Sequence, residues 1–75
     1  MKLNTLSKNS TCSIDGLIGD AQITDRLSDL GLYKGLELEC LGRAPFGGPL
    51  IFRFGSGILA LREKEAACVL ITPRT

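Results

Sequence analysis

Apolar and polar residues alternate with a period of two over much of the second half of the chain, which predicts β-strands that bury one face. The alternation is clearest in residues 36–40 and 50–54, where every second side chain is Leu, Phe or Cys. Gly16 interrupts an earlier apolar segment and predicts a bulge or a turn there. Pro73 is expected to end the last strand. The predicted strands cover residues 12–18, 36–40, 50–54, 58–62 and 68–72.

The period changes in residues 20–30, which predict the one substantial helix of the chain. Asp20 is a suitable N-cap, because its carboxylate can accept hydrogen bonds from the free N–H groups of the first turn. Gly31 stands where a left-handed residue would end the helix. An isolated helix of this length is marginal, so packing must hold it in place. Its apolar face is formed by side chains at i, i+4 and i+7, which are Ile23, Leu27 and Leu30.

Three segments are expected to connect these elements. They are a loop rich in Gly and Pro, a tight turn and a single helical turn, over residues 42–49, 55–57 and 63–67. Residues 1–11 are weakly patterned, and only Leu3 and Leu6 could dock them on the rest of the chain.

Five short strands and one helix in 75 residues favour an all-β fold that closes, or nearly closes, into a barrel, because closure removes exposed strand edges. A sandwich would need about seven strands and about 100 residues. We therefore expect a small SH3-like β-barrel of about five strands, with one capping helix over an open end. Residues 1–75 are expected to form a single domain.

The composition narrows the functional classes. The formal net charge is +1, so a charge-driven nucleic-acid binder is not expected. The absence of His removes the usual proton shuttle and the Ser-His and Cys-His nucleophile pairs, so we expect no enzyme and no catalytic residues. No apolar run resembles a signal peptide or is long enough to cross a bilayer, so neither secretion nor direct membrane insertion is expected.

The chain has three cysteines, Cys12, Cys40 and Cys68. They are widely spaced and form no CxxC pair. An odd number argues against a secreted disulfide scaffold, so we expect a cytoplasmic protein with reduced thiols. Each cysteine is more simply a small core residue than a ligand of a shared metal. Asp25 and Asp29 could share a helix face, but ferrous iron also favours imidazole, and a solvated face is the simpler interpretation. No cofactor and no metal site are expected.

An ordered set of short pieces resembles the ferrous iron transport protein A (FeoA) family. The resemblance covers residues 12–72, and its most specific part is LGxxxG followed by APxGGP. The pieces are Arg26-Leu27, Leu30-Gly31-Leu32, Gly35, Ala44-Pro45, Gly47-Gly48-Pro49, Leu61-Arg62 and Glu65-Ala66.

This resemblance implies an SH3-like barrel without catalytic machinery that acts in the cytosol as an accessory protein of ferrous iron uptake. It also implies a partner, the ferrous iron transport protein B (FeoB), which is a membrane permease with a cytosolic GTPase domain. The expected contact is with that cytosolic GTPase domain or with the membrane part, and weak self-association stays open.

The loop between the second and third predicted strands carries the candidate partner-binding residues. Phe46 at its tip either folds back onto the barrel or serves as an anchor for a partner, since aromatic residues near arginine are typical hot spots. Residues 40–62 hold three arginines and no acid, which would suit an acidic partner if they share a surface with the loop. The predicted partner-binding residues are Arg43, Ala44, Pro45, Phe46, Gly47, Gly48, Pro49 and Arg53.

Three alternatives accompany this expectation. Arg43, in a mobile loop, could act as an arginine finger on the permease GTPase, although such residues are rare among surface arginines. Arg53 or Arg62 could instead pair with a glutamate, Glu37 or Glu39, on a neighbouring strand. The chain could also be a metal-responsive sensor or assembly module, similar to the SH3-like C-terminal domain of iron-dependent repressors.

Overall fold

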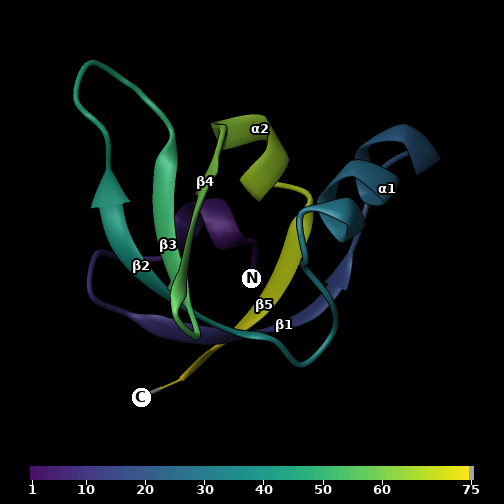
Figure 1. Ribbon diagram of the computed structural model, residues 1–75, viewed down its shortest axis with the longest axis horizontal. Helices are drawn as coiled ribbons and strands as arrows, with labels where there is room; N and C mark the ends of the chain where they lie inside the picture. Colours follow the sequence, from purple (N-terminus) through teal and green to yellow (C-terminus); the bar gives the residue numbers. More distant parts are fainter. Residues whose placement is uncertain (75) are drawn as a thin grey trace.

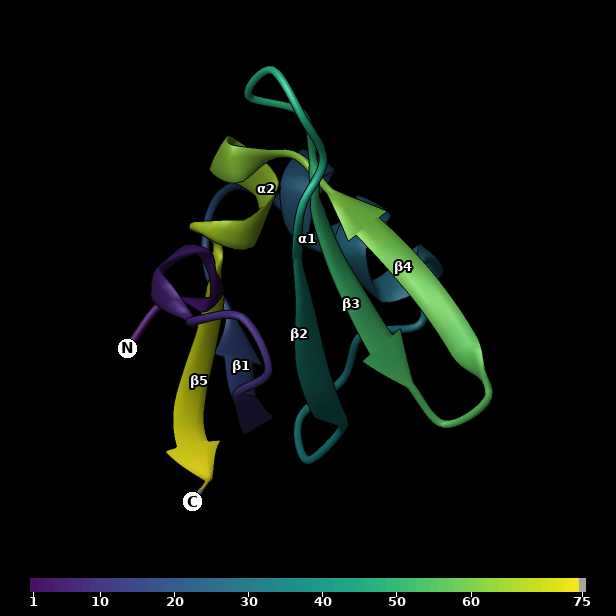
Figure 2. The same ribbon diagram turned by 90° about the vertical axis from the view of Figure 1, so that its left-hand side faces the viewer.

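The computed structural model describes residues 1–74 and consists mainly of one antiparallel sheet. Its strands are β1 (Thr11–Leu17), β2 (Glu37–Arg43), β3 (Leu50–Phe54), β4 (Gly57–Leu61) and β5 (Val69–Arg74). The helical elements are η1 (Leu3–Thr5), α1 (Ala21–Asp29) and α2 (Glu63–Ala66). The strands follow the order β4-β3-β2-β1-β5, so β4 and β5 are the two edges of the sheet (Figures 1 and 2). The expected all-β fold with one longer helix and one helical turn is confirmed.

The core lies on the inner face of this curled sheet, and the alternation of the sequence determines which side chains enter it. Alternate residues are buried in the first part of each of β2 and β3, and Phe52, at the centre of β3, is the largest core side chain and fully buried. The helices add Leu27 and Ala66. The remaining core side chains come from the five strands, from η1 and from the connections, namely Leu3, Leu6, Cys12, Ile14, Leu32, Leu38, Cys40, Leu50, Leu59, Leu61, Val69 and Ile71.

The ends of α1 follow the predicted capping. The Asp20 carboxylate accepts a hydrogen bond from the Ile23 N–H at 3.0 Å. At the other end, Gly31 has a φ of +99°, and the Leu32 N–H donates to the Leu27 carbonyl, which is the Schellman arrangement. This turn leads Leu32 back into the core, while Leu30 is exposed. The prediction that Leu30 shares the buried face was therefore wrong, because the chain reverses one residue later.

Two strand ends differ from the sequence-based expectation. β2 continues through Gly42 and Arg43, which were expected in the loop, because a bulge between Cys40 and Gly42 absorbs one extra residue. β5 continues past Pro73 to Arg74, and an edge strand tolerates a proline because one side of it needs no donor. The predicted irregularity at Gly16 is confirmed by a register shift against β5.

The N-terminal segment is part of the barrel. Leu3 is fully buried and Leu6 nearly so, which confirms their docking role. The backbone of Met1 exchanges two hydrogen bonds with Ile71 of β5, at 2.7 and 3.2 Å, and Lys2 forms a bridge with Leu70. This segment therefore covers the outer edge of β5.

We predict that Leu3→Ala lowers the free energy of unfolding by about 2–4 kcal/mol, because a fully buried leucine leaves a cavity when it is truncated. Urea unfolding followed by circular dichroism measures the change. The matched control is Thr5→Ala in the same short helix, whose side chain is exposed and bonds only locally to Lys2. Equal effects of the two substitutions would contradict the docking of this segment.

Candidate partner-binding surface

The connection between β2 and β3 forms a projecting hairpin arm, which we define as residues 43–49 (Figures 1 and 2). The Ala44 N–H donates to the Pro49 carbonyl at 2.9 Å, and the Gly48 N–H donates to the Pro45 carbonyl at 3.3 Å. The two residues between, Phe46 and Gly47, have φ values of +63° and +70°. Two consecutive positive φ angles are typical of a type I′ turn, which usually carries Asn and Gly.

Phe46 is the unusual residue of the arm. A bulky side chain in the left-handed region is a genuine conformational outlier, and such strain costs about 1–3 kcal/mol. Its side chain is also fully exposed, so no burial within the chain offsets that strain. Of the two interpretations of Phe46, the structure contradicts the one in which it folds back onto the barrel.

Arg43 holds the arm against α2. Without the bulge its side chain would point outward; the extra residue instead places Arg43 opposite Leu50, on the inner side at the barrel rim. There its guanidinium donates to the Glu63 carboxylate at 2.5 Å and to the Gly48 carbonyl at 3.5 Å. The Arg43 interaction keeps the pKa of Glu63 below its usual value. Arg43 is thus the last residue of β2 and is paired with Glu63, whereas the arginine-finger alternative supposed a free arginine in the loop.

Arg53 lies apart from the arm. It faces Glu39 across the β2–β3 pair on the outer side of the sheet, and the two side chains form an ion pair at 3.4 Å. This confirms the cross-strand pairing expected for Arg53. It lines a separate polar groove together with Glu37 and Arg74, which pair with each other. The structure thus brings seven of the eight predicted binding residues together in the arm and separates Arg53 from them.

A shallow groove of about 360 Å³ runs between the arm and α2. One wall is made by arm residues, and the other by α2 and the residue on either side of it. Arg62 and Lys64 on that wall form no ion pair within residues 1–74. The sequence analysis did not predict this second wall, although two basic residues, Arg62 and Lys64, stand at the end of a predicted strand and just after it. The lining residues are Gly47, Gly48, Pro49, Arg62, Glu63, Lys64 and Ala67.

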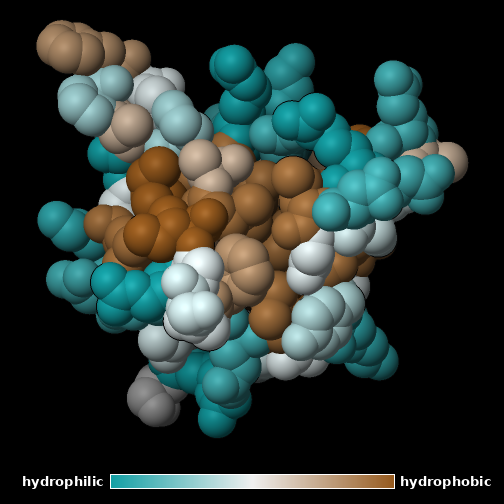
Figure 3. Space-filling view, viewed as in Figure 1, coloured by the Kyte–Doolittle hydropathy of each residue, from teal (hydrophilic) through white to brown (hydrophobic). Residues whose placement is uncertain are grey.

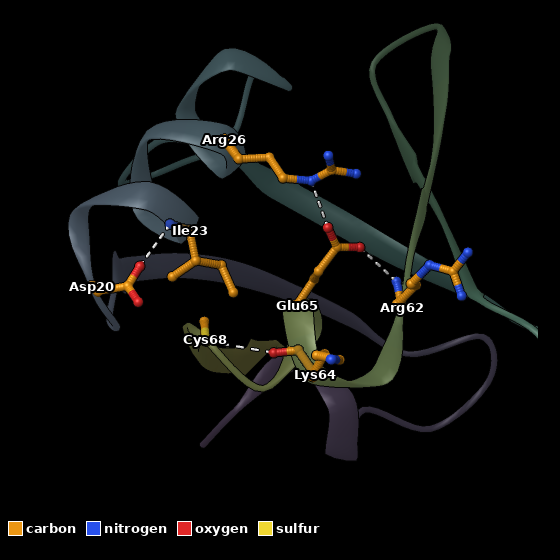
Figure 4. A network of polar contacts seen from close by, with 7 residues as sticks. All are labelled: Asp20, Ile23, Arg26, Arg62, Lys64, Glu65 and Cys68. Atoms are coloured by element: carbon orange, nitrogen blue, oxygen red, sulfur yellow. Dashed lines mark hydrogen bonds and ion pairs between the residues drawn. The ribbon is translucent and has the colours of Figure 1, made fainter.

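The position of α2 depends on Glu65, a nearly buried carboxylate shown in Figure 4. One of its oxygens accepts the Arg62 backbone N–H at 2.9 Å, and the other accepts Nε of Arg26 from α1 at 2.7 Å. The Arg62 N–H bond is the main cause that keeps the pKa of Glu65 below its usual value, with Arg26 adding to it against the opposing effect of burial. A single side chain therefore caps α2 and ties it to α1.

The cysteines occupy the packing positions expected of them, with Cys12 and Cys40 buried and Cys68 half-buried, all as free thiols. Burial raises the pKa of Cys12 to about 11, so this thiol stays protonated at neutral pH. Within residues 1–74 no three His, Cys, Asp or Glu side chains come together as a metal-binding group. None of the helices in that part of the chain is long and apolar enough to cross a membrane.

The fold and the projecting arm define a small antiparallel barrel of the SH3-like class. A family model described as the FeoA domain matches residues 1–73, so the chain belongs to the FeoA family. This family of small SH3-like proteins is linked to ferrous iron transport. No curated protein sequence matches the chain.

Solved structures agree with this assignment. An FeoA-like protein from Clostridium acetobutylicum is 27% identical, with a TM-score of 0.88 over 97% of this chain and 85% of that one. FeoA of Stenotrophomonas maltophilia in complex with zinc is 30% identical, with a TM-score of 0.79 over 96% of this chain and 89% of that one. A manganese-dependent transcriptional repressor in complex with manganese has a TM-score of 0.89 over 99% of this chain and 36% of that one. That last match is 18% identical and shows the fold alone.

We predict that Glu65→Ala lowers the free energy of unfolding at pH 7 by about 1–3 kcal/mol, because it leaves the Arg62 N–H without its acceptor. Glu65→Gln keeps an oxygen that can accept the Arg62 N–H bond and loses only the ion pair with Arg26. Because the Arg26 side chain is 65% exposed, this variant should lower the free energy of unfolding less than Glu65→Ala.

A carboxyl group whose pKa is lowered by folding stabilises the folded state above its ordinary pKa of about 4.3, and this contribution is lost as the pH falls through the lowered pKa. The difference between the wild type and Glu65→Gln should therefore shrink between pH 7 and about pH 3. Urea unfolding at both pH values measures it, and a pH-independent difference would contradict the role of the ionised carboxylate.

Proposed function

We propose that this chain is a cytosolic accessory protein of ferrous iron uptake that binds the cytosolic part of the FeoB permease through its arm. Family membership supports the link to iron uptake. The arm supports the place of contact, with Arg43 to Pro49 as the binding segment. Arg53 is left out of the proposed contact, because its guanidinium pairs with Glu39 on the outer face.

The observation that carries this proposal is the conformation of Phe46. The chain holds a fully exposed phenylalanine at a positive φ, where asparagine or glycine would be less strained. Strain that no contact within the chain offsets is typical of a residue that makes its contacts with a partner. Burial of a phenylalanine ring in a partner pocket would supply about 1.5–3 kcal/mol.

Two further features suit a protein partner. Arg43 connects the arm to α2 through Glu63 and braces the arm itself through the Gly48 carbonyl, and contacts that order a segment before binding lower the entropy cost of binding. The groove beside it carries the charges of Arg62 and Lys64, which form no ion pair in the part of the chain that the structure describes and which favour an acidic face on the partner and a faster encounter.

We predict that Phe46→Asn weakens binding to the purified cytosolic GTPase domain of the cognate permease by about 10- to 100-fold. Asparagine is well suited to the first central position of a type I′ turn, so the arm should keep its shape and the chain its stability. Isothermal titration calorimetry measures the affinity, with and without ferrous iron.

The matched control is Tyr33→Asn, which removes another exposed aromatic side chain outside the arm and should leave the affinity unchanged. Equal binding by Phe46→Asn and the wild type would refute the arm as the contact. No binding of the wild type to this domain would refute the proposed partner domain and direct the search to the membrane part of the permease.

The role of Arg43 is open to a separate test by charge exchange with Glu63. If Arg43 acts by holding the arm, Arg43→Glu should weaken binding about 10-fold and the double variant Arg43→Glu with Glu63→Arg should recover most of it, since the ion pair is rebuilt. If Arg43 contacts the permease directly, the double variant should stay weak. Titration of each variant into the same GTPase domain distinguishes the two.

The likeness in fold to a manganese-dependent repressor is the observation behind a second candidate function, a metal-responsive sensor or assembly module. Calorimetric titration of the chain alone with ferrous and manganous ions separates the candidates. A stoichiometric site of micromolar affinity is required by the sensor function, whereas the accessory function requires none.

A further inference from the structure

The two edge strands of the sheet, β4 and β5, differ in whether other parts of the backbone cover them. The β5 edge is covered by the backbone of Met1 and by the bridge between Lys2 and Leu70, and Pro73 near its end offers no N–H. Among residues 1–74, none covers the β4 edge in this way. Within residues 1–74, the backbone of β4 forms hydrogen bonds only with β3.

The turn before β4 determines which of its backbone groups are left without a partner. Gly55 has a φ of +54° and Ser56 a negative one, as in a type II′ turn, whose flanking residues Phe54 and Gly57 form the hydrogen-bonded closing pair. Hydrogen-bonded and non-bonded pairs alternate along an antiparallel ladder. Leu59 therefore bonds to β3, while the N–H and carbonyl groups of Ile58 and Ala60 point to the open side.

The surroundings of this open edge are apolar. Figure 3 shows brown, hydrophobic side chains gathered over β3 and β4 at the centre of this face, with teal, hydrophilic side chains around the rim. Ile58 is 65% exposed, Ala60 is exposed and Ile51 beside it is half-buried. Natural edge strands are usually protected by charges, prolines or bulges. None of these lies in residues 57–61.

We propose that β4 is a self-association edge, which pairs antiparallel with β4 of a second copy of this chain. Ile58 and Ala60, whose backbone groups point to the open side, lie directly before and after Leu59 in the strand. A two-fold axis at Leu59 therefore places Ile58 of each copy opposite Ala60 of the other. This register satisfies all four outward backbone groups on each strand with four hydrogen bonds. It sets a large side chain against a small one and brings no like charges together.

A contact one strand wide buries less than about 1,200 Å², so the association is reversible and depends on concentration. The arm lies beyond the end of β4 at Leu61, which pairs with Leu50. Antiparallel pairing therefore sends the two arms to opposite ends of the joined sheet, and neither is covered. The proposed dimer is thus independent of the proposed permease contact, and either can fail alone.

Amide hydrogen exchange by NMR tests the register directly, with the chain at about 20 µM and about 1 mM. The amides of Ile58 and Ala60 should exchange about tenfold more slowly at the higher concentration, while the Leu59 amide, bonded to β3, should not change. Sedimentation over the same range should show the mass move from monomer toward dimer. A monomer at both concentrations, or slower exchange at residues outside β4 only, overturns the proposal.

Two variants test whether the β4 edge is the contact between the two copies. Ala60→Pro removes an outward N–H without breaking a bond to β3, and Ile58→Lys puts a charge on the exposed side of the edge. Both should remain monomeric at about 1 mM, whereas Tyr33→Lys, an equivalent charge placed outside the sheet, should dimerise like the wild type. If Ala60→Pro loses its β-sheet circular dichroism signal and is therefore unfolded, the oligomeric state of Ile58→Lys alone tests the contact. Dimerisation of Ile58→Lys as strong as that of the wild type overturns the proposal.

Discussion

The carboxylate of Glu65 determines where α2 lies, and the rest of the candidate surface follows from that position. It bonds to the backbone N–H of Arg62, the N-cap residue of α2, and to Arg26 on α1, so a four-residue helix that could not exist alone is held on two sides. Glu63, two residues earlier in the chain, bonds both to Asn4 of the N-terminal segment and to Arg43 of the arm. The short helix thus carries one set of polar contacts to α1 and a second set to the N-terminal segment and the arm, and the groove beside the arm is a result of its position.

A second constraint acts on the same surface through β2. The extra residue at the bulge between Cys40 and Gly42 reverses the side to which the following side chain points. Arg43 is turned inward toward α2 by this one-residue change, while Arg53, on the unbulged strand, stays on the outer face with Glu39. Two arginines of similar sequence setting therefore have different roles, one in placing the arm and one in a cross-strand ion pair.

Much of the fold could be predicted because local chemistry and long-range packing agree. Alternation gave the buried faces of β2 and β3, and Asp20 and Gly31 gave the ends of α1. The errors have a common cause, since each depends on which neighbour a residue receives. The direction of Arg43 requires the register with β3, the continuation through Pro73 requires knowing that β5 is an edge, and the exposure of Leu30 requires the path after Gly31. The basic wall of the groove was missed because only the folded chain places Arg62 and Lys64 beside the arm.

The position of β1 between β2 and β5 also bears on how the chain reaches this structure. Ile14 pairs with Ile71, so strands from the two ends of the sequence must meet before the sheet is complete. Closing so long a loop carries an entropic penalty that is recovered only when β5 is in place, and folds dominated by distant pairings form slowly. The hairpins from β2 to β4 need no such closure and can form as soon as their residues are available. During synthesis, the residues of β2 and β3 would then be available to pair before β5 is made, and the addition of β5 would complete the core.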